Sequence, residues 1–177
     1  MTSGCVSGEA PGVLDLRQVT IGHPAAQLLV EAVQEEYVAR YGSRDESPID
    51  HTEFTPPRGA FFVGYLDGEP VVSGAWRRRD DVEVAGTRAT AEVKRMYVVP
   101  SARGLGVARR MLAHLEATAF AAGAEAVILE TGTMQPEALA LYESAGYEVV
   151  AGFGHYRDSP YNRCFAKACP DDTPRPS

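Results

Sequence analysis

The chain of 177 residues contains 17 Lys and Arg against 24 Asp and Glu, for a net charge of −7, and 45% of its residues are hydrophobic. This composition is typical of one globular domain with a single core, and the acidic total argues against a nucleic-acid-binding protein, whose surface is basic. The first residues lack the basic and apolar regions of a signal peptide, and no apolar run approaches roughly 20 residues, so we expect a cytoplasmic protein without a membrane span.

The first half of the chain predicts one strand, one helix and three further strands. The predicted ranges are 13–19, 24–40, 60–66, 70–77 and 89–99. The helix is expected to end at Gly42, and Asp67-Gly68 is a hairpin signal between two of the strands. The apolar face of the helix is predicted to contain Leu28, Leu29, Ala32, Tyr37 and Val38.

Two polar segments interrupt these elements. The segment 43–59 contains four carboxylates and three prolines and has room for one short helix, and its length is typical of a functional loop. The run Arg77-Arg78-Arg79-Asp80-Asp81 stands at the end of a predicted strand. We expect this run to be the solvated tip of a hairpin.

The second half of the chain alternates helix and strand. A helix is predicted over 105–122 and another from Pro136 to the residue before Gly146, and strands are predicted at 126–131, 147–150 and 161–168. The apolar positions expected to face the core are Val107, Met111, Leu112, Leu115 and Ala119 in the first helix, and Ala138, Leu141, Tyr142 and Ala145 in the second.

This order of elements indicates the fold class. Antiparallel strands followed by a β-α-β-α-β alternation predict an α/β (α+β) fold, with a mixed, mostly antiparallel central sheet flanked by helices. We expect this single domain to span residues 13–169. The polar segments 1–12 and 170–177 are expected to be flexible termini.

The most informative stretch is 92–112, where a strand runs into a turn with two glycines, Gly104 and Gly106, and the turn runs directly into a helix. Glycine lets backbone N–H groups approach a ligand, and the first N–H groups of a helix carry partial positive charge, so this turn is a candidate anion site. Arg103, Arg109 and Arg110 are expected to surround it. A tight turn without a ligand is the alternative that two glycines alone leave open.

The charge distribution supports an anion site. Residues 88–110 contain six Lys and Arg and one Glu, a local charge of +5, so the rest of the chain sums to −12 because the total is −7. Two well-known phosphate loops do not fit, since the turn has no Gly-Lys-Ser/Thr and no third glycine.

With its flanking residues, the turn resembles the GCN5-related N-acetyltransferase (GNAT) superfamily, in which a strand ends in Gln/Arg-x-x-Gly-x-Gly/Ala. The matching residues are Arg103, Gly104, Leu105, Gly106, Val107 and Ala108. A second match follows, because Ile128–Thr131 and then Ala138–Tyr147 resemble another signature of the superfamily, a strand followed by a helix and a further strand. Together the matches cover about residues 60–168, whereas residues 13–59 fit by element order only.

The resemblance implies acetyl-CoA as the cosubstrate and no metal. It places the pantetheine arm along Met96, Tyr97 and Val98, and the pyrophosphate on residues 102–107. Gln135 falls where many members have an Asn that contacts the cofactor. The resemblance also implies the superfamily's fold, a mixed, mostly antiparallel central sheet flanked by helices.

Acetyl transfer to an amine needs a base that deprotonates the amine and an acid that protonates the departing thiolate. The resemblance implies Tyr142 as the acid, although a tyrosine on the apolar stripe of a helix is also a common core residue. For the base it leaves two candidates, Glu92 and Glu130, which match positions used in different branches of the superfamily. Both lie on predicted strands beside the cofactor groove, where burial would raise the carboxyl pKa.

Strand periodicity slightly favours Glu92 as the base, because Lys94, Met96 and Val98 share its face at a period of two. A carboxylate paired with a neighbouring arginine is the structural alternative for either glutamate. A covalent route through Cys164 or Cys169, with His155 as its base, is disfavoured because nothing in the local sequence lowers a thiol pKa.

The odd count of three cysteines without a CxxC pair argues against a disulfide framework and against structural zinc. The histidines show no metal-ligand spacing either. The sequence therefore predicts no metal, and it leaves a homodimer open.

The acceptor is expected to be a small-molecule primary amine that attacks acetyl-CoA directly in a ternary complex. In the superfamily fold the 43–59 loop roofs the acceptor pocket, so its carboxylates would attract a cationic amine, although a hydrated loop is an equal alternative. These carboxylates are Asp45, Glu46, Asp50 and Glu53. Two other functions stay open: a protein or peptide N-acetyltransferase, and a non-catalytic acyl-CoA-binding regulatory domain.

Overall fold

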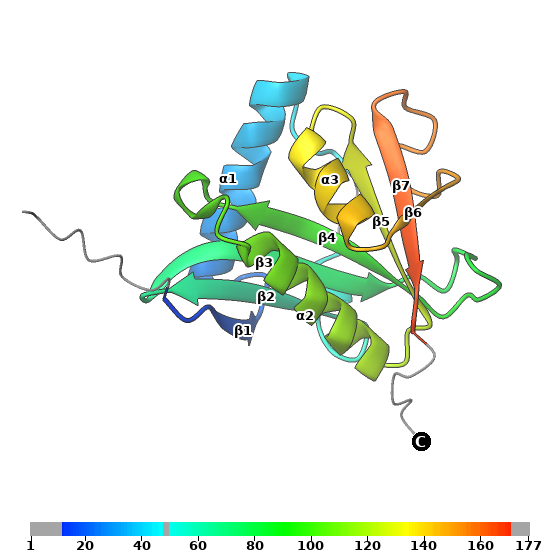
Figure 1. Ribbon diagram of the computed structural model, residues 1–177, viewed down its shortest axis with the longest axis horizontal. Coiled ribbons are helices and arrows are strands. Elements are labelled where there is room, and N and C mark those ends of the chain that lie inside the picture. Colours follow the sequence, from blue (N-terminus) through cyan, green and yellow to red (C-terminus); the bar gives the residue numbers. More distant parts are fainter. Residues whose placement is uncertain (1–11, 48–49, 171–177) are drawn as a thin grey trace, which may run out of the picture.

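The computed structural model describes residues 12–47 and 50–170, which form a seven-stranded sheet with helices on both faces (Figure 1). The strands are β1 (Asp15–Val19), β2 (Gly59–Leu66), β3 (Glu69–Arg78), β4 (Thr90–Val98), β5 (Ala126–Gly132), β6 (Glu148–Val150) and β7 (Asn162–Ala168). The helices are α1 (Pro24–Tyr41), α2 (Val107–Ala121) and α3 (Pro136–Ser144), with short 3-10 turns η1 (His51–Phe54) and η2 (Pro100–Ala102). The expected flexible termini lie outside the described residues, apart from Gly12 and Pro170.

The sheet has the strand order β1-β2-β3-β4-β5-β7-β6, and every neighbouring pair is antiparallel except β4 and β5, which are parallel. This confirms the predicted fold class. The predicted elements are all present, with ends that differ by no more than about two residues, because turn residues punctuate the chain where the sequence indicated. Gly42, for example, ends α1 in the left-handed conformation, with φ 79°, and its N–H bonds to the Val38 carbonyl.

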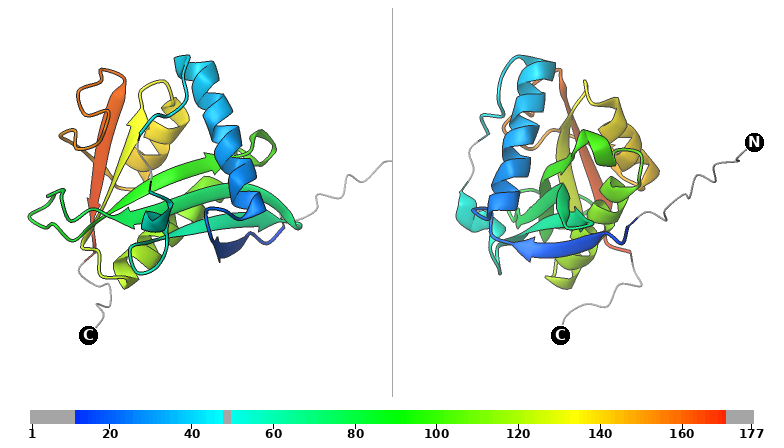
Figure 2. Two further views of the ribbon diagram at one scale, coloured as in Figure 1. Left: turned by 180° about the vertical axis from the view of Figure 1, so that it is seen from behind. Right: turned by 90° about the vertical axis from the view of Figure 1, so that its left-hand side faces the viewer.

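The helices cover opposite faces of the sheet, with α1 on one side and α2 and α3 on the other (Figure 2). The main core lies between α2 and the sheet, and the predicted apolar face of α2 is confirmed, since its five residues are all buried. A smaller core joins α1 and η1 to β2 and β3. None of the helices in the described ranges has the length and apolar composition that a membrane crossing needs.

The predicted apolar face of α1 is wrong in part. Leu28 is 62% exposed and Val38 is 45% exposed, while the buried positions of the helix are Ala26, Leu29, Val33 and Gln34. The buried set includes small Ala26 and polar Gln34 and leaves out Leu28 and Val38, so apolar character alone does not identify the contact face of this helix. The C-terminal half of α1 faces a cavity rather than a core.

The feature that positions the site is the early separation of β4 from β5. The two strands pair only from Thr90 opposite Ala126 to Val93 opposite Leu129, and beyond that point they diverge (Figure 1). On the other edge of β4, the register to β3 shifts after Lys94, and Arg95 has a positive φ of 58°. This is a β-bulge, which bends its strand and increases its twist.

The bulge also corrects an expectation about strand faces. Met96 and Val98 pack against the same core as Ala91 and Val93, on the side of α2. Because the extra residue resets the alternation of side chains, they do not share the face of Glu92. The predicted face containing Glu92, Met96 and Val98 is therefore wrong.

Candidate functional site

A cavity of about 820 Å³ opens where β4 and β5 diverge. Its walls come from the C-terminal half of α1, from β4, from the turn before α2, from β5, from α3 and from the loop before β7. The predicted site residues on these walls are Met96, Tyr97, Val98, Arg103, Gly104, Gly106, Val107, Ala108, Glu130, Gln135 and Tyr142. Two predicted site residues, Leu105 and Glu92, do not line the cavity.

The glycine turn has the geometry of an anion site. Gly104 and Gly106 both have positive φ, 79° and 76°, and apart from each glycine and its two chain neighbours no described residue has an atom within 4 Å of the point where a Cβ would stand. Gly106 is the N-cap of α2, and no side chain caps this helix end. The turn therefore offers backbone N–H groups and open space together, which fits a phosphate group.

Arg103 lines the cavity but already has a partner on the opposite wall. Its Nη2 donates to Glu36 Oε2 on α1 at 2.5 Å, and its Nε donates to the Val98 carbonyl at 3.1 Å. Glu36 also accepts from Arg40 at 2.5 Å. This carboxylate thus ties α1 to the glycine turn.

The other two arginines near the turn differ from one another. Arg109 lines the cavity and donates to Ser144 Oγ on α3 at 2.5 Å. Arg110 points to the Leu14 carbonyl at 3.4 Å and does not line the cavity. The expectation that all three arginines surround the turn is therefore wrong for Arg110, because the helix carries its side chain away from the turn.

Tyr142 reaches the cavity from α3 while most of its ring is buried. Its ring packs against Tyr147 and Phe165, with centroids 5.8 and 5.9 Å away. Burial raises the pKa of Tyr142 far above its ordinary value of 10, and nearby Tyr37 adds to the effect. Its hydroxyl therefore stays protonated at neutral pH and cannot serve as a base there.

Gln135 stands at the N-cap position of α3. Its Nε2 donates to the Tyr41 hydroxyl on α1 at 3.4 Å, so this amide spans two walls of the cavity.

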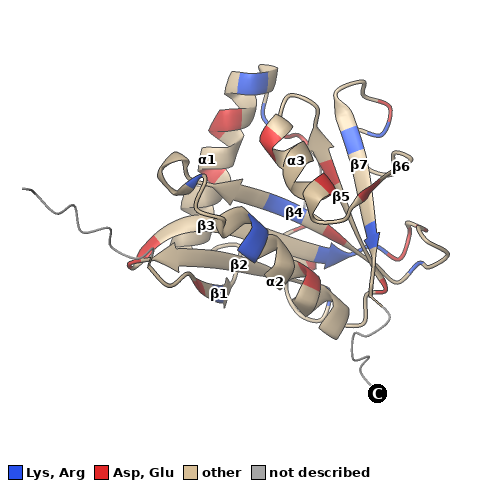
Figure 3. Ribbon diagram, viewed as in Figure 1, with Lys and Arg blue, Asp and Glu red and all other residues tan. Residues whose placement is uncertain are grey.

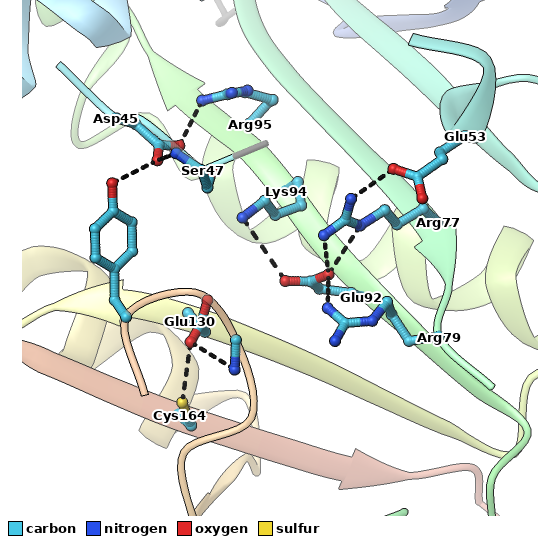
Figure 4. Close-up of polar contacts among 12 residues, drawn as sticks. Asp45, Ser47, Glu53, Arg77, Arg79, Glu92, Lys94, Arg95, Glu130 and Cys164 are labelled. Atoms are coloured by element: carbon cyan, nitrogen blue, oxygen red, sulfur yellow. Dashed lines mark hydrogen bonds and ion pairs between the residues drawn. The ribbon is translucent and has the colours of Figure 1, made fainter. Parts of the chain in front are cut away.

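Glu92 is the centre of a buried ionic cluster (Figure 4). Its side chain is 1% exposed, and its Oε2 accepts from Arg77 Nε at 2.9 Å and from Arg79 Nη1 at 2.7 Å. Lys94 Nζ lies 3.7 Å from Oε1. The prediction that Arg77 and Arg79 are part of a solvated hairpin tip is therefore wrong, because the buried carboxylate draws both guanidinium groups inward.

The cluster also overturns the expected pKa of Glu92. Burial on its own raises this pKa, but the charges of Lys94, Arg77 and Arg79 outweigh burial and hold it below the ordinary value of 4.5. Glu92 is therefore ionised, with its Oε2 engaged by Arg77 and Arg79.

Glu130 lies on β5 and faces the cavity. Its Oε1 accepts from the Gly154 N–H at 3.1 Å and from Asn162 Nδ2 at 3.0 Å, and it lies 3.6 Å from Cys164 Sγ. Burial raises the pKa of Cys164, and the Glu130 charge acts in the same direction. The thiol is therefore protonated, in line with the expectation that this cysteine is not a nucleophile.

The loop after α1 folds back onto the cavity wall through Asp45. Asp45 Oδ2 accepts from Arg95 Nη1 at 2.9 Å, and its Oδ1 accepts from the Tyr156 hydroxyl at 3.1 Å. Burial would raise the pKa of Asp45, but hydrogen bonds from Ser47 and the charges of Arg95 and Lys94 hold it below its ordinary value.

Two more carboxylates of this loop are also paired with arginines. Asp50 lies 3.5 Å from Arg58 and caps η1, and Glu53 lies 2.6 Å from Arg77. With Asp45, three of the four loop carboxylates have cationic partners. The expected attraction of this loop for a cationic amine is therefore weak.

The cavity wall contains more cations than anions. Figure 3 shows a basic band on β4 between α1 and β5. The lining cations are Arg40, Arg44, Lys94, Arg95, Arg103 and Arg109, and the lining anions are Glu36, Asp45, Glu130 and Glu137. The sequence indicates the basic segment but predicts no site role for Lys94 or Arg95, since neighbours in a regular strand lie on opposite faces.

No cluster of three or more His, Cys, Asp or Glu suited to a metal ion occurs in residues 12–47 and 50–170.

Comparisons with known proteins agree on one family. The model of the acetyltransferase (GNAT) family matches residues 26–147, more than half of the chain. A protein named IAA acetyltransferase from Azospirillum brasilense is 32% identical over 151 residues, which cover 85% of this chain and 94% of that protein. N-acetylaspartate synthetase from Rattus norvegicus is 30% identical over 112 residues, which cover 63% of this chain and 36% of that protein.

Among solved structures, a Klebsiella pneumoniae protein assigned as an acyl-CoA N-acyltransferase superposes with a TM-score of 0.71. The identity is 24%, and the match covers 88% of this chain and 97% of that one. This likeness supports the fold.

The ionic cluster predicts the effect of Glu92→Gln on stability. We expect the free energy of unfolding to fall by about 1.5–3 kcal/mol at neutral pH, because the variant removes the buried carboxylate that Arg77 and Arg79 share, while Arg77 keeps Glu53 and Arg79 keeps Asp81. Because folding lowers the pKa of Glu92, the ionised carboxylate stabilises the fold above pH 4.5. This stabilisation is lost as the pH falls through the pKa that Glu92 has in the folded protein. Urea unfolding at several pH values measures both effects.

Glu31→Gln is the matched control, because it breaks an exposed pair with Arg44 and should lower the free energy of unfolding far less than Glu92→Gln does. Equal stability of the two variants, or a difference that persists at low pH, would contradict the role of Glu92 in the cluster.

Proposed function

This chain belongs to the acetyltransferase (GNAT) family and is an acetyl-CoA-dependent acetyltransferase; we propose that it transfers the acetyl group to a primary amine of a small molecule in the cytoplasm. The amine attacks directly, in a ternary complex. One observation carries this proposal: a single cavity connects the uncapped N-terminus of α2 with the residues of α1 on the other face of the sheet, through the gap between β4 and β5.

The two ends of this cavity suit two substrates. Acetyl-CoA, when bound, supplies an acetyl group activated as a thioester. The turn at residues 102–108 would hold its pyrophosphate on backbone N–H groups, and Met96, Tyr97 and Val98 lie on the part of β4 that β5 leaves free for the pantetheine arm. Gln135 would add a contact from α3. The amine would enter from the side of α1.

Tyr142 is the proposed acid. It lines the cavity within an aromatic cluster and brings an O–H group to the wall from which the departing sulfur can take a proton. Backbone N–H groups of β4 beyond Val93 are not paired with β5, and they would be donors for the negative charge that develops on the carbonyl oxygen.

Glu130 is the proposed base, in preference to Glu92. Glu130 lines the cavity, and hydrogen bonds from Gly154 and Asn162 hold its carboxylate in place. Glu92 is shielded from the cavity and neutralised by arginines, and its lowered pKa makes it a weak base. In this proposal Glu92 has a structural role.

The closed acceptor side favours a small molecule over a protein. Tyr156 joins the loop before β7 to the loop after α1, since its hydroxyl donates to Asp45 and accepts from the Glu46 N–H at 2.9 Å. The bridge would obstruct an extended peptide. The names of two relatives, IAA acetyltransferase and N-acetylaspartate synthetase, also refer to small molecules.

Thiol release tests the proposed activity. The purified protein is mixed with acetyl-CoA and a panel of amino acids, polyamines, aminoglycosides and peptides, and free thiol is followed over time. We expect thiol release above the hydrolytic background with small amines only. Binding of acetyl-CoA without release for any acceptor would favour a non-catalytic acyl-CoA-binding domain, and release with peptides alone would favour a peptide acetyltransferase.

Gly106→Glu tests the pyrophosphate site. We expect the Kd for CoA to rise at least about tenfold relative to Gly106→Ala, because a carboxylate at the N-terminus of α2 repels phosphate. Gly106→Ala is the matched control, since both variants have the same strain at φ 76° and only one adds charge. Calorimetry measures both affinities, and equal values would contradict the assignment.

Tyr142→Phe tests the acid. We expect kcat to fall about 100-fold with little change in CoA affinity, because only the proton donor is removed. Tyr147→Phe, in the same aromatic cluster but off the cavity wall, should keep most of the activity. Steady-state kinetics with the best acceptor measures this difference. A normal kcat for Tyr142→Phe would make Tyr142 a core residue only.

A further inference from the structure

Lys94 is a cavity-lining cation whose charge has only a loose partner. Its side chain is 13% exposed, and its Nζ lies 3.7 Å from Glu92 Oε1, beyond hydrogen-bond distance. Arg77 and Arg79 donate to the other oxygen of Glu92 (Figure 4). Within the described part of the chain, Lys94 Nζ makes no hydrogen bond, and Glu92 Oε1 has no hydrogen-bond partner.

Arg95, the next residue, has an unused donor. The residue is 9% exposed and lines the cavity, and its Nη1 donates to Asp45 Oδ2 at 2.9 Å. Its Nε is buried and has no partner among residues 12–47 and 50–170. Buried polar groups are almost always paired, so an unpaired guanidinium N–H on a cavity wall points to a ligand.

The bulge brings these two cations together at one place. Lys94 and Arg95 directly follow Val93, the last residue of β4 that pairs with β5, so they lie where the gap between the strands opens. Their charged groups contact residues on the α1 side of the sheet and not the glycine turn. They are therefore near the point of acetyl transfer, on the acceptor side.

The charges around this place favour an anionic acceptor. Asp45 is engaged by Arg95 and Tyr156, so it has little net attraction left for a cation. A polyamine would bring further positive charge next to Lys94 and Arg95, whereas a carboxylate would supply the missing acceptor to both.

We propose that Lys94 and Arg95 bind the carboxylate of the acceptor, and that the acceptor is an amino acid. This inference rests on the proposed acetyltransferase activity and names its substrate class. Because both cations lie at the opening of the gap, the carboxylate and the reacting amine must be close together in the substrate. That condition fits an amino acid better than a long amine with a distant acid group.

The reaction leaves the carboxylate unchanged. The neutral amine nitrogen forms a bond to the acetyl carbonyl carbon, and the bond from that carbon to sulfur breaks. Glu130 takes the proton that the nitrogen loses, and the sulfur takes a proton from Tyr142. The products are an N-acetyl amino acid and CoA with a free thiol.

Matched pairs of acceptors test the proposal. Thiol release is measured with each of the common L-amino acids and with the corresponding amino acid amides, which lack the carboxylate. We expect kcat/KM to be at least about tenfold higher for the best amino acid than for its amide. The amide has the lower amine pKa and more neutral amine at neutral pH, so amine reactivity alone predicts the opposite order.

Lys94→Met should raise KM for the preferred amino acid about tenfold or more, and it should leave KM for its amide and the Kd of acetyl-CoA within about twofold. Lys94→Arg should restore most of the preference, which a purely structural role would not require. Arg44→Gln is the matched control, because Arg44 also lines the cavity but its charge is paired with Glu31 at 2.7 and 2.8 Å. We expect this control to keep the preference.

Equilibrium binding gives a readout without turnover. Calorimetry of the CoA complex with the N-acetyl amino acids and their amides should show binding of carboxylates to the wild type and weaker binding to Lys94→Met. Turnover of amines with no preference for carboxylates would overturn this proposal but leave the proposed activity intact. Absence of carboxylate binding in the CoA complex would overturn it as well, whereas carboxylate binding without any thiol release would support the subsite and reject only the activity.

Discussion

The interruption of pairing between β4 and β5 after Val93 is the constraint on which the rest of the structure depends. If β4 and β5 stayed paired along their whole length, the sheet would be continuous there and no opening would connect its two faces. One extra residue at Arg95 bends β4 away, so the backbone of Met96 to Val98 loses its neighbour on that edge. The cavity and the backbone groups of β4 that do not pair with β5 both result from this one change in the strand.

The same bulge decides which side chains meet. Before it, alternate residues of β4 point to the α1 side or to the α2 side in the usual way. After it, the order is shifted by one, so Met96 and Val98 join the core beneath α2. Lys94 and Arg95 become neighbours on the cavity wall, which a regular strand would not allow. A small backbone irregularity thus places two cations together at the centre of the site.

Charge is distributed unevenly between the structural and the functional parts of the molecule. Glu92 is held by two arginines and contributes to the fold, whereas Glu130, on the neighbouring strand, faces the cavity. Glu36 links Arg103 at the glycine turn to Arg40 on α1, so two walls of the cavity are connected by ion pairs. The net charge of −7 therefore coexists with a cavity wall on which cations outnumber anions. Local fields act over roughly 8–10 Å, which is why the total charge says little about the ligand.

The sequence by itself determined the order and type of the elements, the glycine turn and the family resemblance, because glycine positions, apolar spacing and short motifs are local properties of the chain. It also identified Tyr142 and both glutamates as candidates. Only the tertiary structure decided that Glu92 is enclosed by Arg77 and Arg79, that Leu28 and Val38 face outward, and that Lys94 and Arg95 share the cavity wall. These outcomes depend on partners distant in sequence and on a bulge that resets side-chain alternation, and a periodic pattern read along one strand contains neither.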